Sequence, residues 1–278
     1  MSEMPDTQKN GQPDVAGIDL QKVGIRELKV PINFVRKEGT PISLETNVSM
    51  YVDLNAEVKG ISMSRLPRTL YEYLNKGEVS YQLMEDILKD LKEKLFSKNS
   101  FLKFKFNYPM EKTAPASGLK GFDYYPTFIE KKLIGDEIKT TMKIQVRYMA
   151  HCPCSAELSE HLRSQGIMAY PHAQPGFADV TVRVKKDELL YIEDLVKLTE
   201  DALQTIPYPI VKREDEMEIA RRSGETQMFV EDAARRVSSK LENLSQIDDW
   251  MVVCNNDEQL HSHFATSIVF KGVEGGLR

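Results

Sequence analysis

Apolar and polar residues alternate along several long segments of the chain, which is the pattern of half-buried β-strands. In the first half, this alternation predicts a hairpin of two long strands over residues 23–35 and 43–54. Residues 101–108 are strongly aromatic and predict a third strand, and residues 121–133 predict its partner. The first half therefore contains two predicted strand pairs.

Between these pairs the spacing of the apolar residues changes to that of helices. Pro67 suits the first turn of a short helix. Residues 78–96 carry Leu83, Ile87 and Leu91 at steps of four, with charged residues between them, which predicts an amphipathic helix. The predicted order of the first half is ββααββ.

The second half repeats this order. Its predicted elements are strands 137–148 and 177–184, helices 188–205 and 228–244, and strands 250–254 and 264–270. We therefore predict an α+β protein built from two ββααββ units, at residues 20–135 and 136–278, with antiparallel sheets that carry helices on one face. Residues 1–19 lack apolar periodicity and are rich in Pro, Gly, Asp, Asn and Gln, so we expect a flexible N-terminal arm there.

The composition narrows the class of protein. The chain has 278 residues, a formal net charge of -5 and three cysteines. The acidic balance argues against a nucleic-acid or anionic-membrane partner. The sparse, odd set of cysteines, without a secretory signal or an apolar run of membrane-spanning length, favours a reducing cytoplasm over a disulfide-stabilised secreted protein.

Two of the cysteines lie in the segment His151-Cys152-Pro153-Cys154-Ser155, directly after a predicted strand. A reactive thiol or a metal site is one interpretation, and two small buried residues at a strand end are the other. The Cys-x-Cys spacing differs from the Cys-x-x-Cys of zinc ribbons, so a metal here needs ligands from distant segments. Pro153 fixes φ and predicts that the chain leaves the strand as a rigid turn.

Six short motifs occur in an order that resembles the type IB GTP cyclohydrolases, a family with a duplicated tunnelling fold. They are Lys59-Gly60-Ile61-Ser62-Met63-Ser64-Arg65, Cys152-Pro153-Cys154-Ser155, His172-Ala173-Gln174, Asp215-Glu216, Phe229-Val230-Glu231-Asp232 and His261-Ser262-His263. The resemblance covers most of the chain after the arm. It implies an enzyme that converts GTP and water to 7,8-dihydroneopterin triphosphate and formate, the first step of folate and pterin biosynthesis.

The resemblance also implies a divalent metal held by Cys154, His172 and Glu216. A thiolate, an imidazole and a carboxylate suit zinc best, with manganese or iron(II) as alternatives, and three protein ligands leave a position open for water. In such a site, the metal activates a water that attacks C8 of guanine. Cys154 then lies at the centre of catalysis.

Three acidic and basic side chains have both a functional and an ordinary interpretation. Glu231 is either a first-turn carboxylate favoured by the helix dipole or, as the resemblance implies, the anchor that accepts hydrogen bonds from the purine. His261 and His263 are two residues apart in a predicted strand, so we expect both imidazoles on the same face. Alone they are as consistent with surface residues as with catalysts, whereas beside a metal they become acid–base catalysts, His261 first.

The triphosphate of GTP needs local positive charge in an acidic protein. The best candidates are Lys59 and Arg65, with Ser64 as a hydroxyl donor. Ordinary surface charges at a strand end are the alternative interpretation, and Arg147 is a weaker candidate.

The chain departs from the family pattern in its residues at two places, and its stretch from Glu160 to Tyr170 is longer than the family's usual spacing between the cysteine and histidine ligands. Ser62 stands where the family usually has histidine, and Ala173 and Pro175 interrupt a His-Asn-Gln-Arg run. Three further functions stay open: an archaeal-type cyclohydrolase with a cyclic phosphate product, a thiol-dependent enzyme similar to the nitrile reductases, and a non-catalytic protein that binds a purine or pterin.

Tunnelling-fold sheets close into a barrel only by association. The resemblance therefore implies a homo-oligomer, a tetramer, with sites at the subunit boundaries. Exposed edge strands in such a chain favour association for the same reason.

Overall fold

The computed structural model describes residues 11–15 and 17–277. More than half of the predicted N-terminal arm, at residues 1–10 and 16, lies outside the described residues. In the described part, the chain forms eight strands and six helices. The strands make one antiparallel sheet in the order β1-β2-β3-β4-β5-β6-β7-β8, which confirms the α+β class.

The bounds of the elements agree with most of the hydrophobic pattern. The strands are β1 (Leu20–Val35), β2 (Pro41–Leu54), β3 (Asn99–Thr113), β4 (Lys120–Ile134), β5 (Glu137–His151), β6 (Ala173–Val184), β7 (Ile247–Asn256) and β8 (Ala265–Phe270). The helices are α2 (Arg65–Leu74), α3 (Tyr81–Lys94), α4 (Pro153–Ser164), α5 (Ile192–Leu203), α6 (Arg213–Glu225) and α7 (Val230–Glu242). No helix in this part of the chain is both long enough and apolar enough to cross a membrane.

The chain divides into two compact units. The first comprises residues up to 107 together with 128–141, and the second comprises residues 108–127 and 142–278. The distal part of the β3–β4 hairpin thus belongs to the second unit. All the predicted site residues from Cys154 onward also belong to the second unit.

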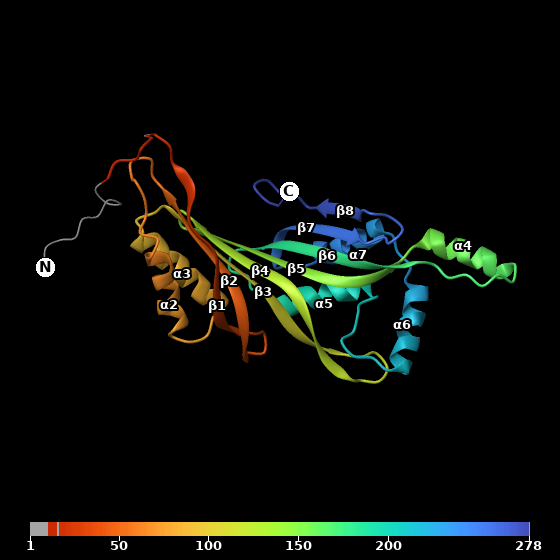
Figure 1. Ribbon diagram of the computed structural model, residues 1–278. Helices are drawn as coiled ribbons and strands as arrows, with labels where there is room; N and C mark the ends of the chain where they lie inside the picture. Colours follow the sequence, from red (N-terminus) through yellow and green to blue (C-terminus); the bar gives the residue numbers. More distant parts are fainter. Residues whose placement is uncertain (1–10, 16, 278) are drawn as a thin grey trace. The chain divides into compact units, whose positions relative to one another are not determined.

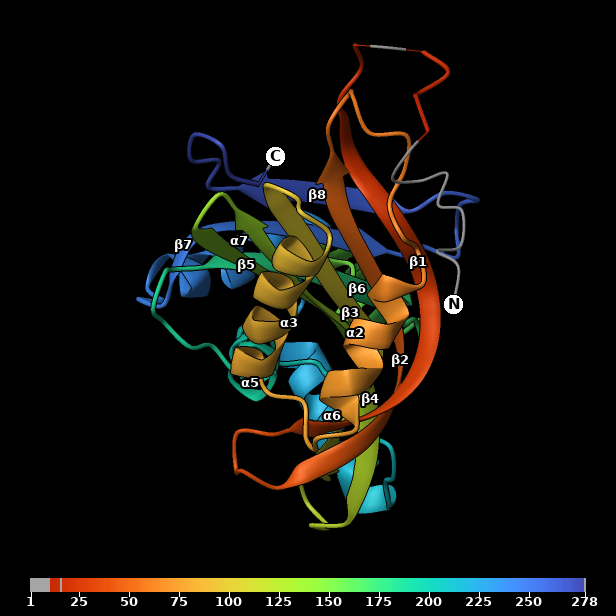
Figure 2. The ribbon, with the colours of Figure 1, turned by 90° about the vertical axis from the view of Figure 1, so that its left-hand side faces the viewer.

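In the first unit, α2 and α3 lie side by side over the strands (Figures 1 and 2). Helix α3 begins at Ser80, whose Oγ accepts a hydrogen bond from the Leu83 backbone N–H at 3.1 Å, as a serine N-cap is expected to do. Ile87 and Leu91 of its apolar stripe are fully buried, and Leu83 is half-buried. The predicted amphipathic helix is confirmed.

In the second unit, α7 packs against β7 and α5. The apolar stripe of α7 includes Val237 and Leu241, which are buried. Strands β6 and β7 pair without interruption from Gly176 opposite Asn256 to Arg183 opposite Asp249. This pairing holds the start of β6 beside the end of β7.

The prediction of only two helices in the second half was wrong, because α4 and α6 are also present. Proline at the first helical position is compatible with a helix start, so Pro153 begins α4 instead of a turn and loop. Helix α6 has almost no apolar stripe, which hides it from a hydrophobic pattern. It is supported by ion pairs along its surface, such as Arg222 Nε with Glu218 at 2.7 Å.

Candidate active site

The cysteine motif lies where β5 gives way to α4 (Figure 1). His151 is the last residue of β5, Cys152 is the N-cap of α4, and Cys154 lies in its first turn. Cys152 is half-buried and Cys154 is exposed. The interpretation of two small buried residues is therefore wrong for Cys154, and the predicted rigid turn is the start of a helix.

His172 lies beside the start of α4. Its backbone N–H donates to Ser155 Oγ at 3.2 Å, which joins the segment before β6 to the first turn of α4. Burial, and secondarily the charge of His172, lower the pKa of His151 below its usual value. The structure therefore brings the two predicted soft and intermediate metal ligands, Cys154 and His172, to the same end of the sheet.

The start of α7 lies at this end as well, because the Met228 N–H donates to the His151 carbonyl oxygen at 3.2 Å. Asp232 caps the helix by accepting the Phe229 N–H at 3.1 Å. The ordinary role of a first-turn carboxylate is thus filled by Asp232. Glu231, its neighbour, is exposed.

Three buried polar atoms at this end of the sheet have no hydrogen-bond partner among the described residues. They are His151 Nδ1, Gln174 Oε1 and Asn256 Nδ2. Because buried polar atoms are almost always paired, such a group indicates a place for a ligand or ordered water. Sequence reasoning missed Gln174 and Asn256 as site residues, since a lone amide in a strand carries no signal without its neighbours in space.

The prediction that His261 and His263 project from one face of a strand was wrong. Strand β7 ends at Asn256 and β8 begins at Ala265, so both histidines lie in the connection, where they are exposed. The polar run after Cys254 interrupts the apolar alternation that a strand needs. Their rings nevertheless stack, with centroids 4.9 Å apart and an interplanar angle of 11°.

The connection that carries these histidines approaches the His172 segment. The Asp257 N–H donates to the Pro175 carbonyl oxygen at 2.8 Å, and Gln174 Nε2 donates to Glu258 at 3.3 Å. Four separate segments of the second unit therefore converge: the start of α4, the start of β6, the start of α7 and the β7–β8 connection.

The described side chains gathered at this end of the sheet are of types that bind zinc, but too few of them lie together to hold it. A thiol and an imidazole are normal zinc ligands. Within the described residues, however, no group of three His, Cys, Asp or Glu side chains has metal-binding geometry. Glu216, the expected carboxylate ligand, is exposed on α6.

Asp215, next to Glu216, has a structural role. It is fully buried and accepts hydrogen bonds from the Lys212 N–H at 2.8 Å, from the Ala116 and Ser117 backbone N–H groups, and from Ser117 Oγ at 2.6 Å. Burial acts to raise the pKa of Asp215, but these hydrogen bonds outweigh it and hold the pKa well below its usual value. Asp215 thereby ties α6 to the β3–β4 turn.

The predicted phosphate-binding residues belong to the first unit. Arg65 begins α2 and donates from Nη1 to the Lys94 carbonyl oxygen at 2.8 Å. Ser64 is the N-cap of α2, and Lys59 Nζ lies 3.1 Å from Asp14. Arg65 lines a cavity, which Ser62 also lines.

Comparisons with known proteins cover nearly all of the chain. A family model described as "Type I GTP cyclohydrolase folE2" matches residues 4–267. A "GTP cyclohydrolase FolE2" of Cereibacter sphaeroides is 36% identical over 274 residues, which are 98% of this chain and 76% of that protein. Another from Ruegeria pomeroyi is 38% identical over 273 residues, covering 97% of this chain and 74% of that protein. These matches confirm the cyclohydrolase resemblance and give the family as folE2, without the type IB designation.

The fold has a solved counterpart. Uricase from Arthrobacter globiformis superposes with a TM-score of 0.57 at 10% sequence identity, over 95% of this chain and 97% of that one. At this identity the likeness concerns the fold alone. It agrees with the expected tunnelling-type architecture.

Proposed function

Because the chain belongs to the type I GTP cyclohydrolase folE2 family, we propose that it converts GTP and water to 7,8-dihydroneopterin triphosphate and formate, the first step of folate biosynthesis. The observation that carries this proposal is the match along 98% of the chain with a GTP cyclohydrolase FolE2. The convergence of thiols, imidazoles and the exposed Glu231 carboxylate in the second unit supports it, because such groups serve as nucleophiles, general acids and general bases.

Glu231 is the proposed purine anchor. A carboxylate can accept two parallel hydrogen bonds, from the ring N–H and from the exocyclic amine of guanine. The capping bond to the Phe229 N–H is made by Asp232, and Glu231 itself is exposed. Because Asp232 makes the capping hydrogen bond, the Glu231 carboxylate is available to a ligand.

His261 and His263 are the proposed proton carriers, with His261 first. Imidazole exchanges protons near neutral pH, and the stacked pair lies in a connection held against the start of β6. Cys154, exposed at the start of α4, is the proposed thiol at the centre of the site.

We further propose that a divalent metal, zinc first, binds Cys154 and His172, with Glu216 as the third expected ligand. The placement of the thiol and the imidazole at one end of the sheet supports this part of the proposal, and the exposed position of Glu216 does not. When bound, such a metal supplies Lewis acidity and lowers the pKa of a bound water.

Arg65, Lys59 and Ser64 are proposed to bind the triphosphate. Arg65 uses one N–H for the Lys94 carbonyl oxygen, and a guanidinium has four more donors for phosphate oxygens. The Lys59 ion pair with Asp14 is exposed on the Asp14 side, so exchange of this partner for phosphate costs little.

The finer architecture is also a proposal. We propose that the chain is an internal duplication and that it associates into a tetramer located in the cytoplasm. The exposed apolar side chains on the edge strand β8, Ile268 and Phe270, support association, because an exposed apolar edge favours pairing with another chain.

The test is to incubate the metal-reconstituted protein with GTP and to measure formate and the fluorescent oxidised pterin. We expect equal amounts of both products, a loss of at least about a hundredfold in rate for Cys154→Ala, and near-normal rates for Cys254→Ala. Treatment with EDTA tests the metal separately. Activity that survives this treatment contradicts the proposed metal dependence but not the proposed reaction. Formate without the neopterin triphosphate product indicates a variant cyclohydrolase, and analysis of the phosphate groups on the pterin tests for the cyclic phosphate. No turnover by well-folded, metal-loaded protein refutes the proposed function.

A further inference from the structure

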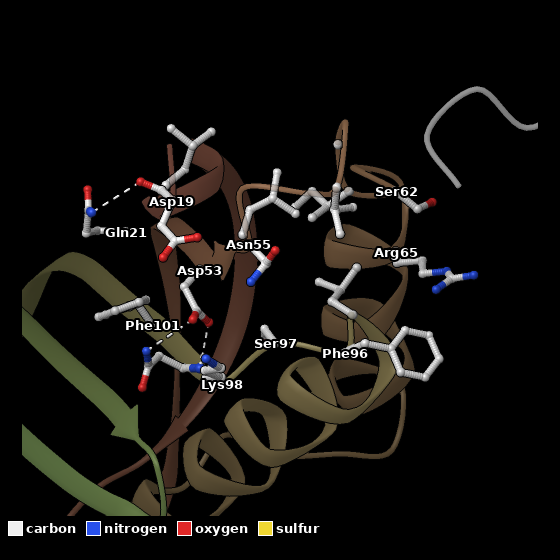
Figure 3. Close-up of a pocket in the computed structure, with 17 residues that line it drawn as sticks. Asp19, Gln21, Asp53, Asn55, Ser62, Arg65, Phe96, Ser97, Lys98 and Phe101 are labelled. Carbon is white, nitrogen blue, oxygen red and sulfur yellow. Dashed lines mark hydrogen bonds between the residues drawn. The ribbon is translucent and has the colours of Figure 1, made fainter. Parts of the chain in front are cut away.

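The first unit contains a cavity of about 890 Å³ near the ends of β1 and β2, bounded by the segment before α2 and the end of α3 (Figure 3). This volume falls within the range of small-molecule sites, roughly 300–1,000 Å³. Much of the wall is apolar, with Leu54, Ile61 and Phe101 among its residues. The cavity is therefore of a size and composition suited to a ring-containing ligand.

Phe96, on the rim of this cavity, has an unfavourable backbone conformation. It follows Leu95, the C-cap of α3, and its φ is 53°. The Phe96 N–H donates to the Glu93 carbonyl oxygen, and the Ser97 N–H to that of Lys92 at 3.0 Å. These bonds define a Schellman motif, in which glycine is the usual residue at the position that Phe96 occupies.

Packing within the chain does not compensate for this strain, because the Phe96 residue is 91% exposed. Phe96 also lines a second hollow of about 590 Å³, together with Ser97 and Lys92. A large aromatic side chain is thus held in solvent at a position where glycine would be more stable. Backbone strain of this kind is characteristic of functional sites.

The polar groups of the cavity favour an acceptor. Ser97 Oγ is buried and has no hydrogen-bond partner among the described residues. Arg65, which lines the cavity, has donors beyond its one bond to Lys94, and Lys98 is exposed on the wall. The free donors are therefore a hydroxyl and two cationic side chains.

The two carboxylates of the cavity are already engaged. Asp53 accepts the Asn99 backbone N–H at 2.7 Å and the Asn99 side-chain amide at 3.3 Å. Asp19 accepts the Ala56 N–H at 2.8 Å. Asp53 therefore uses both carboxylate oxygens within the protein, whereas the exposed Asp19 uses one. The unpaired donors of the wall favour a ligand that accepts hydrogen bonds.

We propose that this cavity binds a planar aromatic ligand with an anionic or hydrogen-bond-accepting tail. The ring packs on Phe96, and the tail accepts hydrogen bonds from Ser97 and from the cationic side chains. A small molecule is favoured over a protein segment because the hollow has the volume of a small-molecule site and an unpaired polar atom in its wall. Purine nucleotides and pterins share this chemistry. Because Arg65 is also proposed to bind the triphosphate of GTP, this inference rests on the proposed function for that side chain and for the choice of probes.

The experiment is calorimetric titration of the intact protein with GTP, neopterin and inorganic triphosphate in parallel. Phe96→Gly is expected to weaken binding of the ring-bearing probe by at least about fivefold, the effect of losing one aromatic stacking contact. The same change is expected to raise the melting temperature by roughly 2–4 °C, because glycine relieves the strained φ. A gain in stability with a loss of binding separates ligand recognition from folding.

Ser97→Ala provides a second variant, for which we expect binding weaker by roughly twofold to tenfold and no loss of stability. Phe122→Ala is the matched control, since Phe122 is an exposed phenylalanine, 56% accessible, that does not line the cavity. It is expected to bind all probes as the unmodified protein does. If Phe96→Gly weakens the binding of neopterin, the ligand is a pterin. If it weakens the binding of GTP, the ligand is a purine nucleotide.

Three results overturn the proposal. The first is equal affinity of the unmodified protein and Phe96→Gly for the ring-bearing probes, and the second is binding of inorganic triphosphate alone. The third is no binding of any probe together with a change of oligomeric state in Phe96→Gly, which assigns the surface to a protein partner. Turnover of GTP is measured on the same samples. If the protein turns over GTP and Phe96→Gly binds the probes as tightly as the unmodified protein does, this inference is refuted and the proposed function is not. Phe96-dependent pterin binding by a chain that does not turn over GTP refutes the proposed function alone.

Discussion

The three cysteines differ in their surroundings. Cys152 and Cys154 lie at the start of α4, half-buried and exposed. Cys254 is fully buried in β7, and burial raises the pKa of its thiol to about 12, with Tyr148 opposing and Asp179 adding to the shift. Since the thiolate is the reactive form, the three thiols differ in reactivity for a physical reason.

We expect a disulfide reagent to modify two thiols in the native protein and three after unfolding in guanidinium. Cys154→Ala is expected to reduce the native count by one, and Cys254→Ala is expected to leave it unchanged. The measurement is the absorbance of the released thiolate over time. Rapid native modification of Cys254 contradicts the buried position.

Gly176 lies where any larger side chain would collide with a neighbouring aromatic ring. A Cβ on Gly176 would lie 2.4 Å from the ring of Tyr148, and the hydroxyl of this ring donates to Asn256 Oδ1 at 2.6 Å. The ring is also buried and anchored at its hydroxyl, so moving away from an added Cβ would cost this hydrogen bond or its packing. Overpacking at such a place costs stability.

Gly176→Ala is expected to lower the free energy of unfolding by about 1–3 kcal/mol. The matched control is Gly224→Ala in α6, where an added Cβ meets nothing within 4 Å and where alanine is expected to stabilise by up to about 1 kcal/mol. Urea unfolding followed by circular dichroism measures both changes. Equal stability of Gly176→Ala and the unmodified protein is the contrary result.

At the scale of elements, α6 shows how a polar helix is fixed in place. The buried Asp215 carboxylate accepts hydrogen bonds from the start of α6 and from the β3–β4 turn. Its pKa is depressed in the folded chain. A depressed carboxylate pKa contributes stability above the unfolded pKa, about 3.9, and this contribution is lost as the pH falls toward the folded pKa.

We therefore expect Asp215→Asn to be less stable than the unmodified protein at pH 7, with a difference that narrows below about pH 4. Glu214→Gln, an exposed neighbour in the first turn of α6, is the control and is expected to change little. Urea unfolding between pH 7 and pH 3 provides the measurement. A constant difference across this range argues against a charged Asp215.

At the scale of the whole molecule, the sheet ends in β1 and β8, each of which has one neighbouring strand in the described part of the chain. The exposed Ile268 on β8 is 59% accessible. Unpaired apolar edges of this kind favour association through further strand pairing.

Sedimentation is expected to give four times the 31.8 kDa mass of the chain. Ile268→Lys is expected to weaken association by at least about tenfold, since a charge on an edge strand opposes pairing. Tyr71→Lys, an exposed aromatic position on α2, is the control and is expected to leave the mass unchanged. A monomer at all concentrations contradicts the proposed tetramer.

Local patterns predicted the elements that have a strong apolar period. The stripe containing Ile87 and Leu91 identified α3, and alternation identified the β1–β2 hairpin. The apolar pattern did not predict α6, because this helix is stabilised by Asp215 and by surface ion pairs, neither of which changes the apolar period. The strand assignment of His261 and His263 failed because strand ends are decided by pairing with a neighbour, and β8 pairs with β7 only from Ala265 onward.

The sequence by itself determined the α+β class, the cyclohydrolase family and the presence of a thiol segment after β5, because these depend on residue identity and on local period. Only the tertiary structure decided that His172, the start of α7 and the β7–β8 connection converge on that segment, and that Gln174 and Asn256 leave buried polar atoms unpaired there. It also decided that Phe96 is strained and exposed beside a cavity. Convergence and burial arise from contacts between residues distant along the chain, and no local pattern encodes them. The strain at Phe96 arises from local hydrogen bonds at the end of α3, at a position where the sequence has no glycine to mark it.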